Sequence, residues 1–347
     1  MIGFQVSNTN RNASRRDGRV AACIALCGAV ALFSQRAQAA EYALGVYGLG
    51  SGVPMSGFTP PPGLYFTDSV YVYRGFAGPD VTLPRGNFLA TNVVEKFQIN
   101  IATLSWFSPF EVLGGTLGLA ATVPYGHESV SADVAFTGPL GVGRELGRTN
   151  GTTGFGQPVL TAQLGWHAGV HNWNVSVSGF VPAGDYTPNS LAIVSLNRPA
   201  VDLRGGYTYL DPKTGTELSA ALGVTFNMTN PAIDYTSGHE FHLEAAWQQH
   251  LPNGISFGLG GYYYQQITGD SGSRAVLGPF EGTVFALGPL LGYTTKIGDT
   301  PVDFNAHIFQ EFDTTNRLQG YSILGSVTIQ LWNPAPPATT KAVTTKY

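Results

Sequence analysis

Cysteine is almost missing from this sequence. Only Cys23 and Cys27 occur, and both lie within the first forty residues. If those residues are removed during export, as argued below, the mature chain has no thiol at all. Thiol catalysis, cysteine metal sites and a disulfide-stapled secreted fold are therefore excluded together.

Charge and long apolar runs are scarce as well. Charged residues make up 12% of the chain, against about 25% in an ordinary soluble domain. The net charge is −4 and no basic cluster follows residue 40, so nucleic acid is not expected as a partner. No apolar run after residue 40 reaches the ~18 residues that a membrane helix needs, which excludes a helical membrane protein.

The N-terminus has the features of an export signal. Arginines between residues 11 and 19 precede an apolar run at 20–33, and Ala37-Gln38-Ala39 is a small-x-small cleavage site. We predict a signal peptide at 1–39 and a mature start at Ala40.

The stretch "ELSAALGVTFNM", 217–228, shows the pattern that dominates the mature chain. Its even-numbered positions are apolar, and its odd-numbered positions are small or polar. A period of two indicates a β-strand, because successive side chains point to opposite faces. Ordinary strands have about 5–6 residues, whereas a strand that crosses a membrane has about 9–11.

The same alternation predicts twelve strands. They span 63–76, 93–106, 115–136, 158–168, 173–183, 200–210, 216–229, 239–251, 255–268, 282–297, 302–313 and 319–332. The third is long enough to hold a bulge at Pro124, and Gly288-Pro289 is expected to interrupt the tenth, because proline cannot donate to the ladder. Aromatic residues near strand ends are expected to form girdles at the two membrane interfaces. They include Tyr65, Tyr71, Tyr73, Trp106, Trp166, Trp173, Tyr207, Trp247, Tyr293 and Trp332.

The connections alternate in length. Short turns at 168–172, 211–215, 252–254 and 298–301 alternate with longer loops at 77–92, 137–157, 184–199, 230–238 and 269–281. Short turns on one rim and long loops on the other are typical of outer-membrane barrels. The predicted fold is all-β: an antiparallel transmembrane β-barrel of about twelve strands, at 63–332, preceded by the signal peptide.

Two segments lie outside the predicted barrel. Residues 40–62 are rich in Gly and Pro and lack strand alternation, so we expect 42–62 either to fold into the lumen as a hatch or to form a loose periplasmic leader. Residues 333–347 are dense in proline and threonine and are expected to be disordered. Trp332 is then the end of the last strand.

A twelve-stranded lumen should be narrow, because eight strands are filled by side chains and sixteen leave an open channel. Polar side chains on the inward face are the candidates that line it, either as a path for a small, partly apolar solute or as pairs that stiffen the wall. They are Asp202, Arg204, Glu217, His242, Glu244, Tyr262, Tyr264, Gln266, Asp303, His307 and Glu311.

Several motifs resemble one known family. They include "GLGSGVPMSGFTPPPGLYFTDSVYVYRG" (48–75), "GFGQPVLTAQLGWHAG" (154–169), "PAGDYTP" (182–188) and "AALGVTFNMTNPAIDYTSGHEFHLEAA" (220–246). "GGYYYQQITGDSG" (260–272), "LGPLLGY", "GDTPVDFNAHIFQEFD" and "NRLQGYSILGSVTI" complete a resemblance over most of 42–331 to the barrel family named for the meta-pathway of phenol degradation. Gln157 departs from the family, whose members usually have Asp there, so no role is carried over for that carboxylate.

The resemblance implies an outer-membrane channel or transporter for aromatic or other hydrophobic molecules, and it transfers no catalytic residue. We expect the outer membrane as the location, with lipid, the barrel assembly machinery and a small hydrophobic or aromatic solute as partners, and no cofactor or metal. Two alternatives stay open: a structural or adhesive barrel without transport, and a barrel hydrolase, for which no nucleophile signature is present. A zinc site from His239, His242 or His250 is a weaker variant of the second.

Overall fold

The computed structural model describes residues 41–334, except 86–87, 138–142, 276 and 280. The predicted signal peptide and most of the predicted tail lie outside the described residues.

The first described residues form a 3-10 turn, η1 (Glu41–Ala43), and the remaining elements are strands. Their bounds are β1 Gly63–Ala77, β2 Leu83–Arg85, β3 Phe88–Val112, β4 Gly115–Thr137, β5 Gly143–Phe155, β6 Val159–Ala168, β7 His171–Phe180, β8 Ala200–Asp211, β9 Thr216–Asn227, β10 Glu240–His250, β11 Ile255–Gln266, β12 Thr283–Ile297, β13 Thr300–Thr315 and β14 Gln319–Trp332.

A search of the described residues for a helix long and apolar enough to cross a membrane found none.

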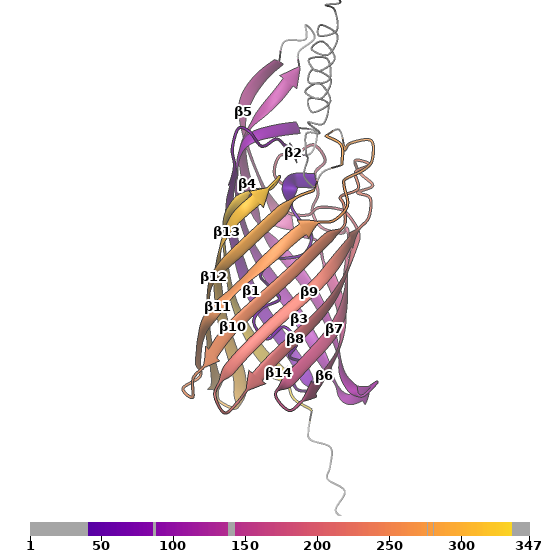
Figure 1. Ribbon diagram of the computed structural model, residues 1–347. Coiled ribbons are helices and arrows are strands. Elements are labelled where there is room, and N and C mark those ends of the chain that lie inside the picture. Colours follow the sequence, from indigo (N-terminus) through magenta and orange to yellow (C-terminus); the bar gives the residue numbers. More distant parts are fainter. Residues whose placement is uncertain (1–40, 86–87, 138–142, 276, 280, 335–347) are drawn as a thin grey trace, which may run out of the picture. The chain divides into compact units, whose positions relative to one another are not determined.

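Twelve of these strands form a closed antiparallel ring (Figure 1). β1 pairs with both β14 and β3, the order then runs from β14 back to β6, and β6 pairs with β4. The β3–β4 ladder closes the ring. β2 and β5 stand outside it and pair only with β3 and β4, at their outer ends. The predicted twelve-stranded antiparallel barrel is confirmed.

Two segments predicted as loops contain strands. The range 77–92 holds β2 and the start of β3, and 137–157 holds β5, so both predictions were wrong in part. β5 continues the line of β6 along the edge of β4, where Tyr125 pairs with Phe155 and Thr122 pairs with Val159. Residues 146–150 of β5 are all exposed. Because neither face of this part of the strand is covered, its sequence does not need to alternate apolar and polar residues.

The bulge predicted at Pro124 is also absent. The β3–β4 ladder passes through Ile101 and Pro124 in unbroken register, and its shifts lie elsewhere. Pro124 sits where the strand on its other side changes from β6 to β5, and its carbonyl accepts a hydrogen bond of 2.9 Å from the Gly156 amide. Proline has no amide hydrogen to donate, and here it lies at the point where the neighbour of β4 changes from β6 to β5. No bulge is needed to accommodate it.

The second predicted interruption affects one ladder and not the strand. β12 runs without a break through Gly288 and Pro289 and pairs there with β11. Its pairing with β13 skips these two residues and resumes at Leu290 in the same register.

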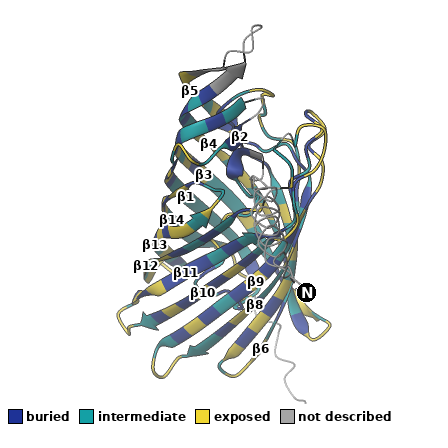
Figure 2. Cartoon of the chain, turned by 45° about the horizontal axis from the view of Figure 1, so that its top comes forward, coloured by how far each residue is buried: buried dark blue, intermediate teal, exposed yellow. Residues whose placement is uncertain are grey.

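The two faces of the wall differ as the alternation predicts. Along β9 the odd-numbered residues are buried, whereas Leu218, Leu222 and Phe226 are exposed. Figure 2 shows the same alternation of buried and exposed residues in bands across the neighbouring strands. Large apolar side chains therefore cover the outside of the barrel, and polar side chains face inward.

The aromatic residues divide between the two faces. Trp173, Tyr207, Trp247, Tyr293 and Trp332 are exposed on the outer face toward the short-turn rim. Tyr65, Tyr71 and Tyr73 instead point inward and line the lumen, so their assignment to a girdle was wrong. Proximity to a strand end does not decide which face a side chain occupies.

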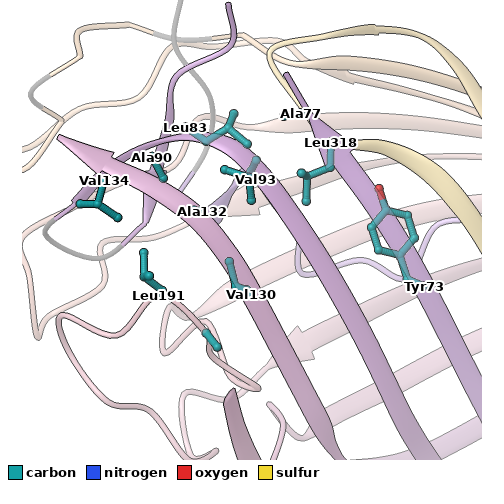
Figure 3. Packing of buried hydrophobic residues seen from close by; sticks show 12 residues of the cluster. Tyr73, Ala77, Leu83, Ala90, Val93, Val130, Ala132, Val134, Leu191 and Leu318 are labelled. Carbon is teal, nitrogen blue, oxygen red and sulfur yellow. The ribbon is translucent and has the colours of Figure 1, made fainter. Parts of the chain in front are cut away.

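A compact apolar cluster forms at the long-loop rim. Leu83, Val93, Val130 and Val134 from β2, β3 and β4 pack there with Leu191 of the β7–β8 loop (Figure 3). The cluster explains why β3 and β4 extend beyond the ring.

A buried ion cluster accompanies these apolar residues. Arg85 pairs with Glu95 and Glu128, and the Ile193 amide donates to Glu128 at 2.7 Å. The apolar contacts and the ion cluster together fix β2 and the β7–β8 loop over the end of the lumen.

The apolar outer face generates a first prediction. Substitution Leu222→Arg, in the middle of β9, should destabilise the barrel in lipid vesicles by about 2–4 kcal/mol, because a charge there would face hydrocarbon. Urea unfolding in vesicles measures the change. The matched control Pro212→Arg, exposed in a short turn, should leave stability nearly unchanged. Equal stability of L222R and wild type would show that this face does not meet lipid.

Candidate functional site

The N-terminal segment, 41–62, lies against the inward face of the barrel wall. At the long-loop rim, the Tyr42 hydroxyl donates to the carbonyl of Ser190 at 3.1 Å. At the short-turn rim, the Tyr65 hydroxyl donates to the carbonyl of Pro61 at 2.9 Å. The segment therefore runs from one rim to the other before the chain enters β1 at Gly63.

Two buried glutamates hold its backbone. Glu244 on β10 accepts from the Gly50 amide at 2.9 Å, and Glu217 on β9 accepts from the Met55 amide at 2.7 Å. The segment belongs to no ladder, so its amides need acceptors inside the barrel. Inward carboxylates supply them, and a hydrogen bond to a charged group is stronger than one between neutral groups.

Donors on the wall bind the carbonyls of the same segment. Arg204 on β8 donates to the carbonyl of Gly52 at 3.0 Å, and Asn174 on β7 donates to that of Ser56 at 3.0 Å. Gly57 lies so close to β7 and β8 that a Cβ there would stand 2.6 Å from backbone atoms of both strands. The fit between segment and wall is therefore specific in both polarity and shape.

An aromatic contact adds to these hydrogen bonds. The ring of Tyr47 stacks on the ring of His242, with centroids 3.7 Å apart. His242 in turn contacts Asp202 at 2.8 Å, and Thr225 donates to the same carboxylate oxygen at 2.7 Å. Polar wall residues thus pair with one another and also provide a surface for the segment.

A chamber of about 890 Å³ lies between the N-terminal segment and the wall. Its wall comes mainly from β1, β3, β4, β13 and β14, on the side away from the contacts just described. The lining is more apolar than polar and includes Tyr71, Phe97, Ile99, Ile101, Pro124, Phe180 and Leu324. Its volume is in the range of pockets for small molecules, about 300–1,000 Å³.

The structure places the eleven predicted lumen residues in three groups, all on inward positions. Five contact the N-terminal segment or support a residue that does: Asp202, Arg204, Glu217, His242 and Glu244. Four line the chamber: Tyr262, Asp303, His307 and Glu311. The remaining two, Tyr264 and Gln266, lie near the long-loop rim, where Gln266 donates to Asp270 at 2.7 Å.

Glu311 is the best-bonded carboxylate of the chamber. It accepts from the hydroxyls of Tyr73 at 2.8 Å and Tyr262 at 2.9 Å, and from the amide of Gly320 at 2.8 Å. His307 is buried and interacts with the backbone of Gly50 in the N-terminal segment. The chamber therefore combines a well-bonded carboxylate with a buried imidazole.

A second buried carboxylate ties two long loops together. Asp270 accepts from the Tyr235 hydroxyl and from the Gly238 amide, the latter at 2.8 Å. Burial raises the pKa of the Asp270 carboxyl, and these hydrogen bonds act in the opposite direction. The loops 228–239 and 267–282 are thereby joined beside the end of the lumen.

Sequence reasoning missed the apolar wall of the chamber and the one arginine that faces it. Tyr71, Phe97 and Ile99 were overlooked because polarity was used as the mark of the inward face. Arg317, between β13 and β14, was overlooked because it is in a loop. The loop, 316–318, is short and polar around the arginine, so no feature of the sequence distinguished Arg317 from an ordinary surface charge.

The described residues contain no group of three or more His, Cys, Asp or Glu side chains placed to hold a metal ion.

The contacts of the N-terminal segment generate a second prediction. Glu244→Ala should raise the hydrogen-exchange rate of the Gly50 amide by about tenfold or more, because a charge-assisted hydrogen bond contributes about 1.5–3 kcal/mol. Exchange at Met55 should change little. Glu217→Ala is the matched control and should show the reverse pattern. Mass spectrometry of peptides that separate the two amides measures both, and unchanged exchange at Gly50 in E244A would contradict the assignment.

Similar folds occur among solved structures. An outer-membrane channel from Pseudomonas putida F1 matches with a TM-score of 0.60 and 14% identity, over 80% of this chain and 99% of that one. The β domain of the Bordetella autotransporter BrkA matches with a TM-score of 0.45 and 8% identity, over 77% and 98% of the two chains. At these identities, the first likeness is a likeness of fold.

Comparison with curated proteins gave no match. A family model does match, over residues 81–326, and its description is "Putative MetA-pathway of phenol degradation". That range covers most of the barrel wall described above, including the chamber side of β3, β4 and β13. The chain therefore belongs to the family of barrels named for the meta-pathway of phenol degradation.

Proposed function

We propose that the protein is an outer-membrane channel that takes up small aromatic or other hydrophobic compounds by passive diffusion through a narrow lumen. The observation that carries this proposal is the chamber of about 890 Å³, lined mainly by apolar and tyrosine side chains. Such a lining suits a partly apolar solute better than a hydrated ion. Membership of a family named for phenol degradation, and a fold shared with an outer-membrane channel, support the same reading.

The proposed location follows from the two faces of the wall. An outer face of exposed Leu, Val, Ile and Phe side chains is stable next to hydrocarbon, and a closed ladder leaves no unpaired backbone edge in lipid. On this proposal the chain is exported with cleavage after residue 39. The barrel assembly machinery then inserts it into the outer membrane.

The N-terminal segment is, on this proposal, the hatch of the channel. It occupies the lumen side of β8–β10 from rim to rim, and it leaves the chamber as the remaining space. Its anchors are individual hydrogen bonds and one ring stack rather than a ladder, so local release is less costly than unfolding of a strand. Movement of this segment would widen the path without opening the wall.

A structural barrel without transport is the second candidate, and the filling of the lumen favours it. Several hydrogen bonds join the backbone of the segment to side chains of the wall, as expected for a segment that permanently fills part of the lumen. Such a protein needs no chamber, however, and a largely apolar chamber of about 890 Å³ is large enough for a small apolar solute.

The hatch generates a third prediction. Deletion of 42–58 should increase single-channel conductance in planar bilayers, because it removes the material that fills one side of the lumen. Deletion of 333–347, of similar length, is the matched control and should leave conductance unchanged. Both variants are first checked for the heat-dependent gel shift of a folded barrel. Conductance of the 42–58 deletion equal to wild type would refute the hatch.

Uptake itself is tested in intact cells, because apolar solutes cross a plain phospholipid bilayer without a channel. A Gram-negative host that expresses the full chain should accumulate labelled toluene several-fold faster than the same host without it. Arabinose uptake should be the same in both hosts. If toluene uptake does not respond to folded protein in the outer membrane, the transport proposal is wrong.

A further inference from the structure

Arg317 differs from the other inward arginines. Arg85 pairs with two glutamates, Arg198 pairs with Glu240, and Arg204 donates to backbone carbonyls. The Arg317 guanidinium forms no hydrogen bond or ion pair with any residue that the structure describes, and its Nη1 is buried without a partner. A buried cationic donor without an acceptor is costly, and this cost points to a group that the protein alone does not supply.

The position of Arg317 is fixed even though its donors are free. Its guanidinium lies over the ring of Tyr264, 4.1 Å from the centroid, a cation–π contact that uses the face of the guanidinium rather than its N–H donors. Tyr264 is itself buried on β11. The side chain is therefore held in place in advance of any ligand.

The nearby carboxylate does not take up these donors. Glu311 stabilises the Arg317 cation electrostatically, but its oxygens already accept from Tyr73, Tyr262 and the Gly320 amide. The charge of Arg317 is thus balanced at a distance, while its buried Nη1 has no acceptor among the described residues.

Two cavities meet at this residue. Arg317 lines the 890 Å³ chamber, and it also lines a smaller pocket of about 260 Å³ at the long-loop rim, formed by Phe76, Gly78, Val81 and Asn316. It is the one residue that the two linings share. Its side chain therefore stands between the rim pocket and the chamber and borders both of them.

We propose that Arg317 recognises the anionic end of the solute, so that the channel selects small apolar carboxylates. The carboxylate binds the free edge of the guanidinium, which matches it in a two-point geometry. The apolar body lies in the chamber beside Tyr71, Phe97 and Ile99. This inference rests on the proposed function and adds the chemical class of the solute.

The test compares two ligands that differ in charge and little in shape. Labelled benzoate and benzyl alcohol are equilibrated with the full chain in lipid nanodiscs, and binding to empty nanodiscs is subtracted. Wild type should bind benzoate about tenfold more tightly than benzyl alcohol, as one charge-assisted pair implies. Arg317→Gln should reduce benzoate affinity to that of benzyl alcohol and leave benzyl alcohol unchanged.

Two further variants separate recognition from structure. Arg317→Lys keeps the charge but not the planar guanidinium, and it should restore part of the preference for benzoate. Arg74→Gln removes an exposed arginine of β1 that does not line the chamber, and it should retain the full preference.

Several results would overturn the inference: no benzoate binding to wild type, equal binding of the two ligands, or a loss of both ligands in R317Q. None of these results depends on the toluene measurement. If toluene uptake responds to the protein while benzoate is not preferred, transport stands and the role of Arg317 is wrong. If benzoate is preferred while toluene uptake does not respond, the site is real and neutral hydrocarbons are not its solutes.

Discussion

Closure of the backbone ladder is the constraint on which the rest of this structure depends. A wall whose outer side chains are Leu, Val, Ile and Phe has no solvent on that side to satisfy amides and carbonyls, so each strand needs two neighbours. The β1–β14 ladder joins the first and last strands of the wall and makes a ring of twelve strands. Every inward side chain is then enclosed, and the polar groups among them must find partners within the ring.

The N-terminal segment meets that second requirement. A chain without a ladder of its own carries unpaired donors and acceptors, and the wall of β7–β10 presents the complementary groups. Glu217 and Glu244 accept its amides, and Arg204 and Asn174 donate to its carbonyls. The opposite wall, on β1, β3, β13 and β14, carries both polar and apolar side chains and lines the chamber. The segment therefore lies on the side of the lumen where β7–β10 present its hydrogen-bonding partners.

The barrel could be predicted from the sequence because its strands carry two different faces in strict alternation. β9 is such a strand, and its inward Glu217 was identified from the sequence for that reason. β5 was missed because both of its faces are exposed and nothing selects for alternation. Tyr71 and Tyr73 were placed on the wrong face, since an aromatic residue near a strand end is compatible with either face.

The hydrogen-bonding partners of Glu217 and Glu244 could not be predicted from the sequence. Both carboxylates accept from main-chain amides, and almost any residue type can supply such an amide. Arg317 illustrates the same limit: its importance arises from where two cavities meet, and cavities depend on packing in three dimensions.

The path of the N-terminal segment has a consequence for biogenesis. The Gly50–Glu244 contact joins residues 194 positions apart, and β1 completes its pairing only with β14. The N-terminal segment therefore acquires its binding partners only after most of the polypeptide has been made, and long-range contacts of this kind form slowly. Until then, water must satisfy its backbone amides and carbonyls. A polypeptide that ends before β10 lacks both the β1–β14 pairing and the Glu244 anchor, so neither its ring nor its lumen can be completed.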